Sequence, residues 1–208
     1  MKDKLLKRYT NVPALLYLLK NRAITLLDPS SWDDRNDSYF LSLYKEKLKL
    51  KTVLALCFTE VGETYHHWRV FADGSSGVCI TFRRDVLVNA VKKHTEIKTG
   101  SVQYVTFARL NKMALRIKSL PFIKRYGFQD ESEFRIIYSS KQTIYSTRDI
   151  PVSLDCIEKI SLNPWMPKPF FDSLKETIQA VDGCKHIKII RSNLIDSAKW
   201  KKIGSSAK

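Results

Sequence analysis

The sequence lacks the features that define several large protein classes. It has no apolar run long enough to cross a membrane, and its basic N-terminal segment carries no stretch typical of a signal peptide. Seven glycines and seven prolines among 208 residues are too few for a collagen-like or largely disordered chain. Glycine-rich phosphate-binding loops, dinucleotide fingerprints and the G-x-S-x-G motif are absent, which disfavours kinases, NAD-dependent dehydrogenases and α/β-hydrolases. We expect a soluble, cytoplasmic protein.

Cysteine and histidine are also scarce, and their spacing is not that of metal ligands. The four cysteines lie far apart without a C-x-x-C motif, which indicates buried thiols in a reducing compartment rather than disulfides or a zinc site. Among the four histidines no H-x-x-x-H or H-x-H pattern occurs, since His66 and His67 are adjacent. The sequence therefore predicts no metal site.

What the chain has in excess is positive charge. Its net charge of +15 and pI near 9.7 predict a polyanionic partner, most often nucleic acid. No acidic residue occurs from position 97 to 129. A helix is predicted over residues 107–120. In one interpretation its basic residues only form a solvated helix face. The other is a nucleic-acid contact made by five residues: Arg109, Lys112, Arg116, Lys124 and Arg125.

Apolar segments predict an α+β fold. Strands are expected at residues 23–27, 53–58, 78–82 and 134–138, and helices at 14–20, 39–51, 83–93 and 170–181. Because strands and helices alternate irregularly, an α+β domain is favoured over a doubly wound parallel sheet. We expect a single domain over residues 1–195 and a basic, flexible tail over 196–208.

Polar clusters interrupt this apolar framework in three places. They are residues 32–37, residues 57–60 with 66–68, and residues 131–138. Charged groups are costly beside a core unless they are paired or used. We therefore expect the three segments to meet at one site.

Glu131 and Glu133 are the leading catalytic candidates. On an extended segment they would point to the same side, about 6–7 Å apart, and like charges at that distance raise the pKa of one of the pair. The alternative is a solvated pair bridged to Arg135 or a lysine. Trp68 offers a stacking surface or belongs to the core.

Several motifs together resemble those of a widespread bacterial and phage family of uncharacterised proteins. They span about 130 residues in the family order, and Arg35 replaces the proline usual in the acidic loop. The motifs are Arg8-Tyr9, Asp34-Arg35-Asn36-Asp37, Cys57-Phe58-Thr59, Trp68 to Phe71, Gly77 to Phe82 and Glu131 to Arg135.

That family in turn resembles the ADP-ribosyltransferases, especially those that modify DNA bases. The resemblance implies a single domain with a mixed, mainly antiparallel, split β-sheet flanked by helices, and NAD as substrate. It also implies that Glu133 is catalytic and that Glu131 orients the nucleophile. The NAD-binding residues it implies are Arg8, Tyr9, His67 and Trp68, with the indole stacked on the nicotinamide.

Three functions remain open on these grounds. The first is an ADP-ribosyltransferase acting on a nucleic acid or a bound protein, as a toxin, phage-defence or counter-defence factor. The second is a nuclease that holds a divalent ion between Asp34, Asp37, Glu131 and Glu133. The third is a nucleic-acid-binding or protein-inhibiting module without catalysis.

Overall fold

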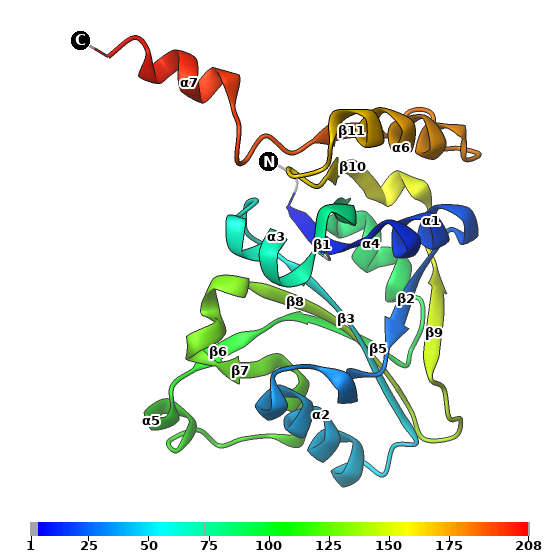
Figure 1. Ribbon diagram of the computed structural model, residues 1–208. Coiled ribbons are helices and arrows are strands. Elements are labelled where there is room, and N and C mark those ends of the chain that lie inside the picture. Colours follow the sequence, from blue (N-terminus) through cyan, green and yellow to red (C-terminus); the bar gives the residue numbers. More distant parts are fainter. Residues whose placement is uncertain (1–3, 73, 208) are drawn as a thin grey trace.

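The structure, a computed structural model, describes residues 4–72 and 74–207 and forms an α+β domain, which confirms the predicted fold class (Figure 1). A nine-stranded sheet is its centre, and only β10 and β11 pair in parallel within it. Its strands are β1 (Leu5–Asn11), β2 (Ala23–Leu27), β3 (Thr52–Thr59), β4 (Gly77–Arg83), β5 (Ile97–Ser101), β8 (Glu133–Ser140), β9 (Thr147–Pro151), β10 (Ile157–Leu162) and β11 (Lys188–Arg191). A separate parallel pair consists of β6 (Gln103–Val105) and β7 (Ile123–Arg125).

The sheet is split between β1 and β3. The strand order is β11-β10-β4-β1-β3-β2-β9. In addition, β8 pairs with β3, and β5 pairs with β8. Whereas β8 pairs with β3 over its full length, β1 meets β3 at a single registered pair, Lys7 with Thr59. Thr59 is also registered with Glu133. Lys7, Thr59 and Glu133 therefore form one row across three strands, at the point where the two halves of the sheet join.

One face of the sheet is covered by the main hydrophobic core. Alternate residues of β3, such as Leu54, Leu56 and Phe58, point to this face. Three helices pack on it through buried leucine, valine and isoleucine side chains. They are α1 (Val12–Asn21), α4 (Arg84–Val91) and α6 (Lys168–Ala180).

The opposite face is covered in two separate places. Helix α2 (Arg35–Lys47) packs Leu41 and Tyr44 on the middle of β3 and β8. Helix α3 (Tyr65–Phe71) packs Trp68 against Tyr9 of β1. Between these two patches the row of Lys7, Thr59 and Glu133 lines a cavity.

Three predicted elements differ from the structure. The helix predicted over 107–120 is wrong: α5 (Phe107–Leu110) ends in a tight turn, and residues 117–122 form a 3₁₀-helix. Pro121 is buried inside this 3₁₀-helix, beyond the end of the predicted α-helix. No strand was predicted over residues 5–11, where the structure has β1. Within the expected tail, residues 198–204 form α7, which stands away from the other elements in Figure 1. In the described part of the chain, no helix is long and apolar enough to span a membrane.

Candidate functional site

A cavity of about 440 Å³ opens between α2 and α3. Its lining comes from β1, the loop before α2, the end of β3, α3 and the segment that leads into β8. The three polar segments singled out in the sequence therefore meet here. Of the residues predicted to act on NAD, five line the cavity: Arg8, Tyr9, His67, Glu131 and Glu133.

Glu133 is held from below by a buried arginine. Arg135 is completely buried, and its Nε and Nη2 donate to the two carboxylate oxygens of Glu133 at 3.1 and 2.7 Å. The same guanidinium donates to Asp37 of α2 at 2.8 and 2.5 Å and to the carbonyl oxygen of Pro121 at 2.9 Å. All five N–H groups of an arginine can act as donors, and here they fix the Glu133 carboxylate in one orientation.

Lys124 holds the second glutamate. Its Nζ donates to Glu131 Oε2 at 2.5 Å and lies 3.5 Å from Glu133 and 3.6 Å from Asp37. Two cations thus face three carboxylates in a largely buried cluster. Such charges are tolerated in a protein interior only when they are paired in this way.

The turn between the two glutamates differs from the extended segment predicted. Glu131 ends a 3₁₀-helix (Tyr126–Glu131), and Ser132 adopts the left-handed conformation with φ 44°. Both carboxylates nevertheless reach the same ammonium group, that of Lys124. The alternative interpretation, a solvated pair bridged to Arg135 or a lysine, is right about the bridging, since Arg135 binds Glu133 and Lys124 binds Glu131. It is wrong about solvation, because Glu131 and Glu133 are only 9% and 7% exposed.

Ionisation of the two glutamates differs. Burial disfavours the ionised form of Glu133, but attraction to Arg135 and the hydrogen bonds from it outweigh burial, so the pKa of Glu133 is lowered. Burial of Glu131 outweighs its bond to Lys124, so the pKa of Glu131 is raised. The cavity therefore contains one carboxylate held ionised and one poised to exchange a proton at higher pH.

Arg8 reaches the cavity through the split in the sheet. Its Nη1 donates to the carbonyl oxygen of Cys57 at 3.2 Å, and burial lowers the pKa of its guanidinium. Among the described residues, none provides a carboxylate within 4 Å of Arg8. A half-buried guanidinium of this kind can donate to a phosphate or a carboxylate of a ligand.

Trp68 lies in the core and does not line the cavity. Its side chain is 1% exposed, and its Nε1 donates to Glu63 at 2.5 Å. In this position no face of the indole is free to stack on a nicotinamide ring, so the implied stacking does not agree with the structure. The ring meets Tyr9 edge-on instead, with centroids 5.1 Å apart. Trp68 therefore supports Tyr9 from behind.

His67 links α3 to the turn that carries the glutamates. Its Nδ1 lies 2.5 Å from Thr64 Oγ1, and its Nε2 lies 3.3 Å from the carbonyl oxygen of Glu131. Because that carbonyl can only accept, Nε2 carries the proton. Burial lowers the pKa of His67, and its ring stacks on Tyr9 at 5.3 Å. His67 is thus a neutral group that holds the glutamate turn.

The predicted nucleic-acid-binding residues fall into two groups. Arg109, Lys112 and Arg116 are exposed, although no single helix carries them. Lys124 belongs to the carboxylate cluster. Arg125 lies over the ring of Phe107, 4.8 Å from its centroid.

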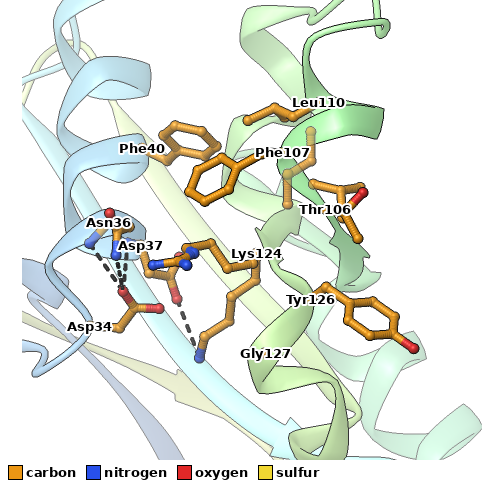
Figure 2. A pocket seen from close by; sticks show the side chains of 13 residues that line it. Asp34, Asn36, Asp37, Phe40, Thr106, Phe107, Leu110, Lys124, Tyr126 and Gly127 are labelled. Carbon is orange, nitrogen blue, oxygen red and sulfur yellow. Dashed lines mark hydrogen bonds and ion pairs between the residues drawn. The ribbon is translucent and has the colours of Figure 1, made fainter.

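A second cavity of about 230 Å³ lies beside the first (Figure 2). Asp34, Asp37 and Lys124 line both cavities and form the wall between them. In Figure 2 the side chain of Lys124 extends towards the aspartates, whereas Phe40 and Phe107 face the cavity from α2 and α5. Two adjoining cavities with a charged wall can hold two different ligands next to each other.

The carboxylates proposed for a nuclease are engaged in other contacts. Asp34 caps α2, since its Oδ1 accepts from the backbone N–H of Asn36 at 3.0 Å, and Asp37, Glu131 and Glu133 bond Arg135 or Lys124. In residues 4–72 and 74–207, no group of three histidine, cysteine, aspartate or glutamate side chains is arranged to hold a metal ion.

Two cavity residues were not assigned a role from the sequence. Trp32 lines the cavity and lies over the Arg135 guanidinium at 5.2 Å. Cys57 lies on the floor, where burial and the nearby Glu133 carboxylate raise the pKa of its thiol well above the ordinary value. Both residues lie within the polar segments of the sequence, and this position was a signal that they could line the site. Which of Trp32 and Trp68 lines the cavity could be decided only from the structure.

Comparisons with known proteins give one family model and structures of one protein. A family model described as "Protein of unknown function (DUF2971)" matches residues 67–136, a stretch that contains the Gly77–Phe82 and Glu131–Arg135 motifs and confirms the resemblance to an uncharacterised family there. No curated protein is significantly similar to the chain. A structure of Thermus sp. 2.9 DarT in complex with NAD+ is 7% identical, with 92% of this chain and 96% of that chain covered and a TM-score of 0.48. The structure of the same DarT in complex with ADP-ribosylated ssDNA is also 7% identical, with 92% of this chain and 95% of that chain covered and a TM-score of 0.47.

Proposed function

We propose that this chain is an ADP-ribosyltransferase that uses NAD to modify a nucleic acid. One observation carries the proposal: Glu133, buried and held ionised, shares a cavity with Arg8, a guanidinium without a carboxylate partner. The pair offers an anionic group for a developing positive charge and a cationic group for a phosphate. An enzyme that breaks the glycosidic bond of NAD needs both groups.

The cavity fits the nicotinamide riboside half of NAD. Its volume of about 440 Å³ lies within the range of roughly 300–1,000 Å³ usual for small-molecule sites. Arg8 would bind the pyrophosphate through charge-assisted hydrogen bonds. Tyr9 and Phe71 supply aromatic surface for the nicotinamide, and Trp68 acts through Tyr9, which it holds in place.

The reaction breaks the bond between ribose C1′ and the nicotinamide nitrogen, and both electrons of that bond leave with nicotinamide. Positive charge then develops at C1′, and the ionised Glu133, fixed by Arg135, stabilises it. The acceptor forms a new bond to C1′ and releases one proton. Glu131, whose pKa is raised, orients the acceptor and takes up this proton.

A nucleic acid is the acceptor that the charge of the chain favours. The net charge is +15, and Arg109, Lys112 and Arg116 are exposed on the segment next to the second cavity. Cations of this kind bind phosphates and bring the strand to the site. Thermus sp. 2.9 DarT binds NAD+ and ADP-ribosylated ssDNA, and we propose ligands of the same chemistry for this chain on the basis of its own cavity.

The test is to incubate the protein with NAD and single-stranded DNA or RNA and to measure released nicotinamide and the mass of the oligonucleotide. We expect nicotinamide release together with a mass gain of one ADP-ribose per modified strand. Glu133→Gln should abolish both, whereas Glu46→Gln on the exposed surface of α2 should change neither. Nicotinamide release that is equal in the wild type and the Glu133→Gln variant would contradict the proposal, as would the absence of any NAD turnover.

A further inference from the structure

The cavity beside the proposed NAD site differs from it in chemistry. Apart from the shared wall, its lining is largely apolar and aromatic: Phe40, Phe107 and Leu110 line it together with Tyr126 (Figure 2). Its volume of about 230 Å³ is below the roughly 300 Å³ typical of the smallest pockets for whole drug-sized ligands. A single planar ring system is therefore the kind of group that it can take.

Phe107 is the exposed wall of this cavity. It is 65% exposed although it is a large apolar side chain, and it lies on α5, the four-residue helix that follows β6. The guanidinium of Arg125 covers one face of its ring. An exposed phenylalanine with an arginine beside it is the combination on which nucleic-acid bases stack, since every base has a π-face and the arginine adds a cation.

The shared wall offers a polar group to such a ring. Asp34 Oδ1 is occupied by the N-terminus of α2, but Asp34 Oδ2 is buried and has no hydrogen-bond partner in the described part of the chain. Lys124 lies on the same wall. An unpaired buried carboxylate oxygen accepts from a ring N–H or an amino group, which apolar ligands lack.

The charge of the surrounding segment selects the class of ligand. No acidic residue occurs from position 97 to 129, a stretch that supplies most of the cavity lining. Arg109 and Lys112 are exposed within it. A ring carried on a polyanion therefore fits better than a free neutral ring or a side chain of an acidic protein.

We propose that this second cavity binds one unpaired base of a single-stranded nucleic acid, stacked on Phe107. This inference rests on the proposed function for the identity of the acceptor and extends it, because the base is held next to the wall that borders Glu133. A base inside a duplex cannot enter, since its faces are covered by its neighbours. The cavity thus selects single strands over duplexes.

The experiment measures binding without NAD, so that it does not depend on catalysis. Dissociation constants are determined by fluorescence anisotropy for a labelled single-stranded DNA 12-mer, for the same 12-mer without bases at its four central positions, and for the duplex. Phe107→Ala is compared with Phe107→Trp and with Phe170→Ala, a control of equal type and similar exposure (67%) on α6.

We expect Phe107→Ala to weaken single-strand binding about tenfold, with no change in the slope of affinity against salt, because no charge is lost. Phe107→Trp should bind like the wild type, and Phe170→Ala should have no effect. The wild type should bind the abasic strand and the duplex less tightly than the intact strand. Equal affinity of Phe107→Ala and Phe170→Ala, or equal affinity for duplex and single strand, would overturn the proposal. If single-strand binding depends on Phe107 but the protein does not turn over NAD, the proposed transferase activity is refuted and the proposed base site is supported.

Discussion

Asp37 and Arg135, which are 98 residues apart in the sequence, are joined by two hydrogen bonds of 2.8 and 2.5 Å in the interior of the protein. Asp37 lies in the first turn of α2 and Arg135 in β8. The same guanidinium holds Glu133, so the position of α2 and the orientation of the proposed catalytic carboxylate depend on one arginine. This relationship ties the stability of the fold to the geometry of the site.

Replacement of Asp37 by asparagine should destabilise the protein. The variant removes one partner of a buried ion pair, which typically costs about 3–5 kcal/mol; because Glu133 still pairs with Arg135, we expect the lower end of this range. Chemical denaturation measures the free energy of unfolding. Asp33→Asn, an exposed position in the loop before α2, is the control, and an equal stability of both variants would show that the pair contributes nothing.

Protonation of Glu131 should set the acid limb of the pH dependence of kcat/KM. Both glutamates act in their ionised form, and the pKa of Glu131 is raised whereas that of Glu133 is lowered. As pH falls, Glu131 is therefore protonated first, and the acid limb of kcat/KM lies above the ordinary glutamate pKa of about 4.3. In Glu131→Gln the remaining activity should persist to lower pH, where only Glu133 titrates. An acid limb that Glu131→Gln leaves in place would exclude the role given to this residue.

Lys124→Met should move the acid limb of the reaction to higher pH. The ammonium group of Lys124 opposes the effect of burial on Glu131, so its loss raises the pKa of Glu131 further. The pKa of Glu133 rises as well, since Lys124 contributes to lowering it. Carboxyl ¹³C chemical shifts followed through a pH titration measure both values. Lys118→Met, on an exposed part of the same segment, should leave both pKa values unchanged.

Arg8→Met should weaken NAD binding more than it slows the chemical step. Hydrogen bonds to a charged group contribute about 1.5–3 kcal/mol, so we expect KM for NAD to rise roughly ten- to hundredfold with a smaller change in kcat. Steady-state kinetics with the exposed Lys4→Met as control measures the difference. A change confined to kcat would place Arg8 outside the phosphate site.

Changing Arg109, Lys112 and Arg116 together to glutamate should weaken polyanion binding. Each lost phosphate contact lowers the slope of log affinity against log salt by about 0.7 for a single strand, so the slope should fall along with the affinity. A matched variant with Lys92, Lys93 and Lys185 changed to glutamate reverses three exposed cations elsewhere on the surface. If both variants bind equally well, the predicted contact surface is wrong.

The fold class and the members of the site could be predicted because local sequence carries them. Apolar runs such as residues 53–58 set the strands, and the charged groups among them had to be paired, as Glu131 is with Lys124 and Glu133 with Arg135. Arg8, which lines the same cavity, was predicted from the family resemblance. The role of Trp68 depended on which side of α3 faces Tyr9, and a seven-residue helix gives little periodicity to decide that. Spacings of three and four at 107–120 predicted a helix, but α5 ends at Leu110, and the following 3₁₀-helix packs Leu120 and Phe122 against α2 instead.

The central claim is that NAD binds between Arg8 and Glu133. The most direct measurement is a crystal structure of the Glu133→Gln variant, which should retain the ligand, grown with NAD+. We predict that the pyrophosphate lies within hydrogen-bond distance of the Arg8 guanidinium and that ribose C1′ lies next to the side chain at position 133. NAD bound elsewhere, or a cavity that stays without NAD at saturating concentration, would contradict the account.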